Sequence, residues 1–140
     1  MRDLARFLSE RFGVPIGFWE GLMISVHNRE AWASTPEVCE IGAPVLRKGI
    51  MLARITPEGW RLSAEGAMLV GKSATLCVLD LEEKEALGFL SGQNLSGRFP
   101  WPEGQVIIRW KGFPIGVGLL RGRVIKNQLR LSRRLPPRKR

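Results

Sequence analysis

The sequence predicts an α+β protein, with helices and strands mixed in the N-terminal part and strands alone in the C-terminal part. Three observations predict this fold class. Apolar residues recur at helical spacing over residues 2–12, capping signals for a second helix follow residue 79, and apolar and polar residues alternate beyond residue 104. The chain has 140 residues, of which 44% are hydrophobic and 25% charged. That length suits one domain, or two small subdomains that share a core.

The N-terminal elements begin with a helix over residues 2–12, where apolar side chains lie three or four positions apart and Gly13 follows as a stop. A hairpin is predicted within residues 22–33, where two short extended runs flank Asn28-Arg29.

Three more elements are expected before residue 80. Residues 50–55 predict a strand, and the turn signal at 56–59 closes it. Ser63 is placed to cap a short helix that ends near Leu69. The unbroken apolar run over 74–79 predicts a buried strand.

A second helix is predicted to begin at Asp80, because this cap residue is followed by Glu83 three positions later and by further acids in the first turn. A loop rich in Ser, Gly and Pro follows over residues 94–103. The side chains expected to be buried on the helix are Ala86, Leu87 and Leu90.

The last strands are predicted over residues 105–126. In the first of them, alternate side chains from Gln105 onward face opposite sides of the sheet. Two turns rich in glycine and basic residues separate the strands, at Lys111-Gly112 and at Arg121-Gly122.

The charge of the chain is concentrated at its C-terminal end. Residues 1–104 hold 11 basic and 13 acidic side chains, a net charge of −2, whereas residues 105–140 hold 11 basic side chains and no acid. These basic residues alternate with Val, Ile, Trp and Leu, so most of them should lie on folded structure. We therefore expect a surface that faces a polyanion, since neutralised phosphates release condensed counterions. A merely solubilising basic tail is the alternative.

Metal and catalytic chemistry are not favoured. Cys39, Cys77 and His27 are too few for a structural zinc site, which uses four ligands. Cys77 lies in an apolar run, where a buried and inert thiol is expected. We expect no cofactor and no metal. No apolar run is long enough to span a membrane and the N-terminus lacks a signal-peptide pattern, so a cytoplasmic protein is expected.

Residues 66–73 match the letters of a phosphate-binding loop, GxxxxGK[ST]. That site needs a strand before the loop and a helix after it, so that backbone N–H groups and the helix dipole meet the phosphates. Here the order of the expected elements is reversed and the loop interior is apolar. We interpret the match as accidental, and a nucleotide-binding enzyme as the less favoured alternative.

The C-terminal segment has a more distinctive layout. A strand leads through a Lys-Gly turn to Phe113-Pro-Ile-Gly-Val-Gly118, and a basic glycine turn leads to Ile125-Lys126-Asn127. With Leu90-Ser-Gly92 upstream, this layout resembles the PUA-like RNA-binding domain at the C-terminus of RsmF-type RNA cytosine-5 methyltransferases. The likeness is strong over 87–127 and looser over 4–134.

The resemblance implies an N-terminal α+β subdomain over 1–80, packed on a PUA-like β-barrel over 81–134, with a basic flexible tail over 135–140. Two positions depart from the family pattern, with Leu119 in place of a lysine and Arg130 in place of a proline. The sequence has neither the family's glycine-rich cofactor loop nor the dipeptide that carries its reactive cysteine, so we expect no methyltransferase domain. We therefore expect no catalytic residue.

Residues of the C-terminal segment are the expected RNA-binding site. Arginine side chains suit phosphates and stacking on bases. Gly116 and Gly118 admit either a neighbouring strand or an RNA backbone, and Asn127 can cap a turn or contact a base. Trp101, between two prolines, is the aromatic expected to be most exposed. The full expected set is Arg109, Lys111, Gly116, Gly118, Arg121, Arg123, Lys126, Asn127, Arg130, Arg133 and Arg134.

The functional prediction is a stand-alone RNA-binding protein that is not an enzyme. By resemblance it would serve rRNA or tRNA modification or ribosome biogenesis, binding structured rRNA or tRNA and presenting it to a separate RNA-modifying enzyme. The alternative is a non-catalytic interaction subunit of an RNA-modification complex, whose basic face docks an acidic protein.

Overall fold

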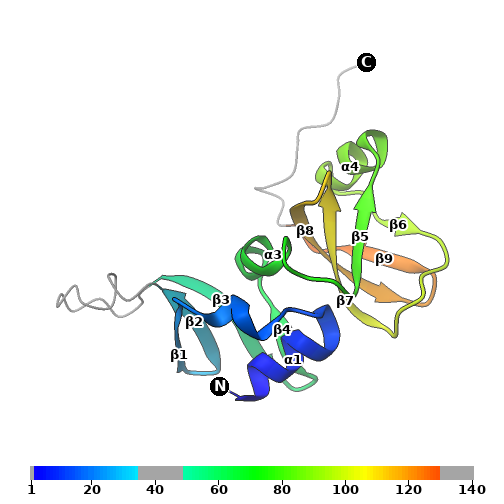
Figure 1. Ribbon diagram of the computed structural model, residues 1–140. Helices are drawn as coiled ribbons and strands as arrows, with labels where there is room; N and C mark the ends of the chain where they lie inside the picture. The colour runs from blue at the N-terminus through cyan, green and yellow to red at the C-terminus, as the bar shows by residue number, and fades with distance from the viewer. Residues whose placement is uncertain (1, 35–48, 130–140) are drawn as a thin grey trace.

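The computed structural model describes residues 2–34 and 49–129, which form two β-sheets covered by helices (Figure 1). The α+β fold predicted from the sequence is confirmed. The first sheet has the order β1-β2-β3-β4 and the second has the order β5-β7-β8-β9-β6. The strands of the first sheet are β1 (Met23–His27), β2 (Glu30–Ser34), β3 (Ile50–Thr56) and β4 (Gly59–Leu62). Those of the second are β5 (Val78–Leu81), β6 (Leu95–Ser96), β7 (Gly104–Trp110), β8 (Phe113–Arg121) and β9 (Val124–Asn127).

The first helix, α1 (Arg2–Phe12), is confirmed where the apolar spacing predicts it. Leu4, Leu8 and Phe12 are buried, because residues three or four positions apart share one face of a helix. Gly13 ends the helix with a φ of +61°, a conformation that glycine adopts without strain. A short 3-10 helix, η1 (Ile16–Trp19), then leads to the first sheet.

The first sheet is built from two hairpins, of which the first is predicted from the sequence; for the second, the strand at 50–55 and its closing turn are predicted, but β4 is not. β1 and β2 pair antiparallel and turn at Asn28 and Arg29, whose φ angles are +48° and +66°. β3 and β4 pair through the turn at 56–59. The sequence of hairpins explains why each strand pairs with its neighbour along the chain.

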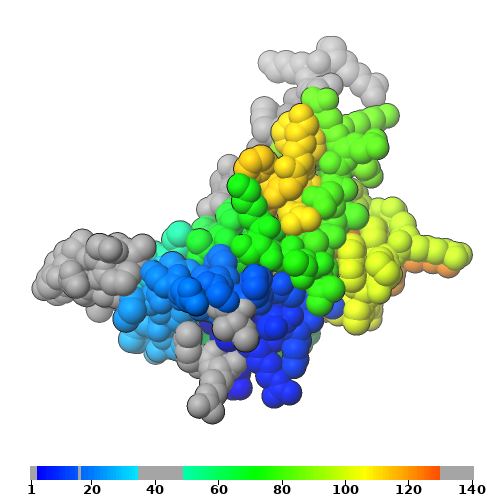
Figure 2. All heavy atoms as spheres, in the orientation of Figure 1, coloured from blue at the N-terminus to red at the C-terminus, as the bar shows by residue number. Residues whose placement is uncertain are grey.

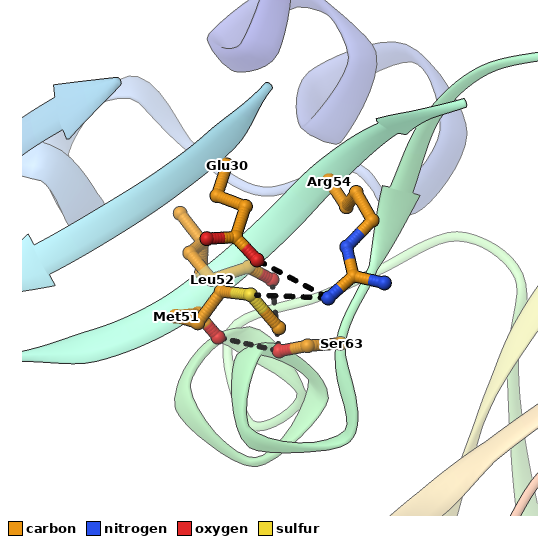
Figure 3. A network of polar contacts seen from close by, with 5 residues as sticks. All are labelled: Glu30, Met51, Leu52, Arg54 and Ser63. Atoms are coloured by element: carbon orange, nitrogen blue, oxygen red, sulfur yellow. Dashed lines mark hydrogen bonds and ion pairs between the residues drawn. The ribbon is translucent and has the colours of Figure 1, made fainter. Parts of the chain in front are cut away.

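The helix α3 (Ala64–Val70) begins at the predicted cap (Figure 3). The hydroxyl of Ser63 accepts a hydrogen bond from the Gly66 backbone N–H at 2.8 Å, and it lies within hydrogen-bonding distance of the Met51 and Leu52 carbonyls on β3. The cap therefore also ties the start of α3 to the sheet. Arg54 lies beside this network and pairs with Glu30 at 3.2 Å.

The region around residue 80 corrects the sequence prediction. The strand expected over 74–79 is β5, at Val78–Leu81, and Cys77 before it has a φ of +51°. Asp80 lies in this strand instead of capping the helix, because β5 pairs parallel with β7 and Asp80 meets Arg109 there. The cap position of α4 (Glu83–Leu90) is therefore Glu82.

The second sheet curls into a half-barrel (Figure 1) in the part of the chain where the sequence predicts a PUA-like barrel. Helix α4 packs on its inner side through Ala86 and Phe89, while Leu87 and Leu90 are only half-buried. The two-residue strand β6 pairs with β9 and lies within the segment predicted as a loop. β5 begins the half-barrel inside the stretch assigned to the N-terminal subdomain, and the predicted boundary at residue 80 stays a prediction.

Strand β7 is buried on both faces. Val106 and Ile108 face the core that α4 closes, with Leu81, Leu120 and Ile125. Ile107 faces the other way, into the core formed with α1, α3 and the first sheet. The predicted alternation along this strand is thus confirmed, and it lets one strand serve two hydrophobic cores.

Gln105 joins the two sheets at the start of β7. It is buried, at 7% exposure, and its side-chain amide makes both possible hydrogen bonds with the backbone of Leu62 at the end of β4. The Leu62 N–H donates to Oε1 at 2.7 Å, and Nε2 donates to the Leu62 carbonyl at 2.9 Å. Buried backbone groups need such partners, because leaving them unpaired costs free energy.

The glycines of β8 are packing positions. A Cβ atom at Gly116 would lie 2.8 Å from Cε1 of Phe89, and one at Gly118 would lie 2.3 Å from Cγ2 of Ile125. Both glycines are buried. Of the two alternatives, close approach of neighbouring protein atoms is the one that the structure supports.

Replacing Gln105 should weaken the join between the sheets. Gln105→Ala leaves the N–H and the carbonyl of Leu62 without their partners, so we expect the free energy of unfolding to fall by about 2–4 kcal/mol. Urea denaturation followed by circular dichroism measures this. Gln93→Ala, at an exposed glutamine, is the control and should change stability little. Equal stability of the two variants would contradict the proposed role of Gln105.

Adding a methyl group at Gly118 should strain the half-barrel. We expect Gly118→Ala to lower the free energy of unfolding by about 1–3 kcal/mol, as overpacking of a filled core does. Gly17→Ala is the matched control, since no atom lies within 4 Å of a Cβ there. Thermal unfolding of both variants tests this, and a stable Gly118→Ala protein would show that the space beside Gly118 is free.

Candidate nucleic-acid interface

Three of the expected residues, Arg121, Arg123 and Lys126, gather at the β8–β9 hairpin, and we call them the β8–β9 basic cluster. Leu119 and Lys126 are cross-strand partners, and Arg121 lies two residues beyond Leu119 on the same strand. Because side chains two apart on a strand, and directly opposite ones, share a face, Arg121 and Lys126 point to the same side of the sheet. Arg123 and Lys126 are exposed, and the Arg121 side chain is 39% exposed.

The turn that carries this cluster is held in place from two sides. The Gly122 N–H donates to the Glu103 carboxylate at 2.8 Å, and the Gly97 N–H donates to the Arg123 carbonyl at 2.9 Å. The turn lies at Gly122-Arg123, one residue beyond the predicted position. Its backbone is therefore fixed before any ligand binds.

A groove between the two sheets begins beside Arg121. A depression of about 260 Å³ is lined by Arg11, Arg61 and Arg121, together with Glu58 and Glu103. Arg11 donates from Nε to the Gln105 carbonyl at 3.0 Å, and its buried Nη2 has no hydrogen-bond partner. Sequence reasoning missed Arg11 and Arg61, because each is an isolated charge in a segment whose net charge is negative.

A second depression, of about 180 Å³, shares Arg61 with the first and is also lined by Arg54 and Gln128. Arg61 and Arg54 are cross-strand partners on β4 and β3, and Arg61 hydrogen-bonds to the side chain of Gln128. Glu30 pairs with Arg54, and Glu65 also lines this part of the groove. The groove thus mixes both signs of charge and is less positive than the β8–β9 basic cluster.

Arg109 is engaged inside the protein. Its guanidinium meets the Asp80 carboxylate through Nε at 3.0 Å and Nη2 at 2.8 Å, and Nη1 donates to the carbonyls of Gly71 and Ala74 at 3.2 and 3.3 Å. The side chain is only 16% exposed. Since its donors already have partners, we leave Arg109 out of the proposed contact surface.

Asn127 is also engaged internally. Its side-chain Nδ2 donates to the carbonyls of Phe89 and Gln93 at 2.6 and 3.0 Å, and its Oδ1 accepts from the Leu129 N–H at 2.8 Å. It therefore satisfies a carbonyl in the last turn of α4, which corresponds to the cap alternative. The remaining expected residues, Arg130, Arg133 and Arg134, lie outside the described residues.

Lys111 lies at the other end of β8 from the basic cluster. It forms the β7–β8 turn with Gly112, as predicted, and its ammonium is 4.8 Å from the centre of the Trp110 ring. Since β8 has nine residues and a strand rises about 3.3 Å per residue, the two turns are about 26 Å apart. Lys111 therefore cannot contact the same phosphate as Arg121.

The most exposed aromatic side chain in the described ranges is Phe113 and not Trp101, so this prediction was wrong. Trp101 is half-buried, because it stacks on Phe99 with ring centres 6.0 Å apart and packs against both cores. Phe113 is 57% exposed, more than any other large hydrophobic side chain in the described ranges.

Cys77 is buried, as expected, at 5% exposure. Burial raises the pKa of its thiol above the ordinary value, an effect that the nearby charge of Arg11 partly opposes. The thiolate is the nucleophilic form of cysteine, and a raised pKa keeps Cys77 as the unreactive thiol. This environment therefore suits an inert side chain. Within residues 2–34 and 49–129, no group of three or more potential ligands is placed to hold a metal ion.

The segment that matches a phosphate-binding loop is mostly helical. Residues 66–70 belong to α3, and Gly66 packs so closely on β3 that a Cβ atom would lie 2.0 Å from the Leu52 carbonyl oxygen. Its backbone N–H groups are thus engaged in the helix and its cap. Across the residues that the structure describes, no helix has both the length and the apolar character needed to cross a membrane.

The family match lies in the C-terminal part of the chain, whereas the matches to individual relatives cover 59% to 92% of the chain. The model of the family described as "Methyltransferase RsmF PUA domain" matches residues 77–135. The "Ribosomal RNA small subunit methyltransferase F" of Aeromonas salmonicida is 35% identical over 88 residues, which are 59% of this chain and 17% of that protein. The protein of the same name from Shewanella pealeana is 24% identical over 135 residues, 92% of this chain and 26% of that protein.

The chain thus spans between about a sixth and a quarter of the length of these relatives. The matched region includes β5, α4 and the strands that carry the basic cluster. The predicted resemblance is confirmed: residues 77–135 are similar to the PUA domain of the RsmF-type methyltransferases.

Proposed function

We propose that this chain is a non-catalytic RNA-binding protein that holds structured RNA, foremost ribosomal RNA, against the β8–β9 basic cluster. Its setting would be the cytoplasm, in rRNA or tRNA modification or ribosome biogenesis. There it would present RNA to a separate modifying enzyme. The observation that carries the proposal is the gathering of Arg121, Arg123 and Lys126 at one hairpin of the PUA-like domain.

The electrostatics of the hairpin support this proposal. Residues 105–140 contain no acidic side chain, so the cations of the cluster are opposed only by acids from elsewhere in the chain. Glu58 lies 3.7 Å from Arg121, but it is 84% exposed. An ion pair so exposed contributes little, because water screens it and both side chains lose conformational freedom. A phosphate can therefore replace Glu58 at small cost.

The names of the relatives support ribosomal RNA as the first candidate ligand, since both are described as methyltransferases of small-subunit ribosomal RNA. The family matched at residues 77–135 of this chain is described as the PUA domain of methyltransferase RsmF. A PUA-like domain with the same hairpin would supply the binding part of that task, and the chemistry would come from another polypeptide or domain.

Binding should depend on Arg123 and Lys126 and on salt. For Arg123→Ala/Lys126→Ala we expect weaker binding of small-subunit rRNA fragments. We also expect the slope of log affinity against log salt concentration to become shallower by about 1.4–1.8, because two phosphate contacts are lost. Mobility shifts at several salt concentrations, with tRNA as a second ligand, measure both quantities.

A matched control separates this surface from overall charge. Arg6→Ala/Lys84→Ala removes the same two residue types from exposed positions on α1 and α4. We expect this control to bind RNA nearly as well as the parent chain. The proposal fails if the parent chain binds no RNA at low salt, or if the two double variants lose affinity equally.

A further inference from the structure

Two aromatic side chains, each with a lysine over its ring, lie together at the β7–β8 hairpin. Trp110 and Phe113 are cross-strand partners, so they share one face of the hairpin. The Lys111 ammonium is 4.8 Å from the Trp110 ring centre, and the Lys72 ammonium is 4.7 Å from that of Phe113. We call these four residues the aromatic tip. In Figure 2 the golden atoms of this hairpin lie at the visible surface, bordered by green atoms of earlier segments.

Lys72 reaches the tip from a distant part of the chain, and its position is held firmly. Gly71 packs on β8, where a Cβ atom would lie 2.6 Å from Cβ of Pro114. Arg109 binds the carbonyls of Gly71 and Ala74, on either side of Lys72, while Asp80 holds its guanidinium. The segment that carries Lys72 is thus fixed against β7 and β8 before a ligand arrives, which reduces the entropy lost on binding.

The composition of the aromatic tip suits one class of ligand. Phe113 leaves more than half of its surface in water, although burial of an aromatic side chain is favourable. An apolar partner would use the rings but would have to desolvate two ammonium groups. A nucleotide can contact both the aromatic rings and the ammonium groups, because its base stacks on a ring and its phosphate pairs with a lysine.

We propose that the aromatic tip binds an unpaired nucleotide of an RNA ligand, with the base stacked on Phe113 and the flanking phosphates near Lys72 and Lys111. A paired base is already stacked inside its helix, so only a loop, a bulge or a free end offers this contact. The proposal rests on the proposed RNA-binding function and adds a second, separate site to it. The tip would give preference for RNA with unpaired bases, while the β8–β9 basic cluster binds phosphates of any RNA.

The test compares two RNA probes with the full chain. One probe is a short unstructured single strand, and the other is a blunt-ended duplex of similar charge. For Phe113→Ala we expect affinity for the single strand to fall about 5- to 150-fold, the span that alanine substitution at base-stacking aromatics corresponds to. The salt dependence should stay the same, because no phosphate contact is lost. Affinity for the duplex should also stay the same.

Three further variants make the result specific. Phe113→Trp keeps a stacking ring and should restore single-strand binding. For the single strand, Lys72→Ala should make the slope of log affinity against log salt concentration shallower by about 0.7, the value for one phosphate contact. Met23→Ala, at a side chain that is 49% exposed on β1, is the control for loss of an exposed apolar group and should have no effect.

The outcomes distinguish the two proposals. If the parent chain binds neither probe, the proposed function itself fails. If it binds both but Phe113→Ala behaves like Met23→Ala, or loses duplex and single-strand binding equally, the aromatic tip is not a nucleotide site. Circular dichroism of each variant shows whether the fold is intact, and rescue by Phe113→Trp excludes a general loss of structure.

Discussion

The structure depends on the burial of β7 on both of its faces. Ile107 contributes to the core shared with α1, α3 and the first sheet, whereas Val106 and Ile108 contribute to the core of the half-barrel. A shift of this strand's register by one residue would move all of these side chains to the wrong core, so the register is strongly specified. The neighbouring Gln105 completes the join by pairing with the backbone of Leu62. The two sheets therefore form one cooperative unit. Because β8 pairs with β7, this unit also fixes the positions of the two turns at the ends of β8.

The elements that could be predicted from the sequence are those with local causes. Helix α1 follows from the spacing of its apolar residues, the first hairpin from Asn28-Arg29, and the start of α3 from the Ser63 cap. The position of β5 could not be predicted in the same way. Its pairing with β7 is parallel and joins residues almost 30 positions apart, and the ion pair with Arg109 draws Asp80 into the strand. A cap signal is local, and here a contact across the sheet outweighs it.

In the candidate site, too, the residues placed by local pattern could be predicted, and those whose role depends on tertiary contacts could not. The β8–β9 basic cluster could be predicted because a turn and the period of two place its members together. Arg109 and Asn127 have the residue types of an RNA contact, but their hydrogen-bonding groups are occupied by partners on β5 and just after α3 for Arg109, and by a partner on α4 for Asn127. Conversely, Lys72 belongs to a segment whose letters suggest a phosphate loop, and only the packing of α3 on β8 brings it to Phe113. Charge and residue type identify candidates, whereas tertiary packing decides which of them remain available.

The length of β8 sets the distance between the turns at its two ends. A nine-residue strand, with one register shift opposite Ile108 and Arg109, separates the two turns, so their spacing depends on a hydrogen-bonded strand and not on a flexible linker. An insertion of one residue would reverse the faces beyond it, whereas an insertion of two would keep the faces and add about 6.6 Å to the span. A change in the distance between the two ends of the half-barrel that preserves the regular pairing therefore comes in steps of two residues, whereas a single inserted residue requires a β-bulge. Each end, meanwhile, remains free to change its own side chains independently.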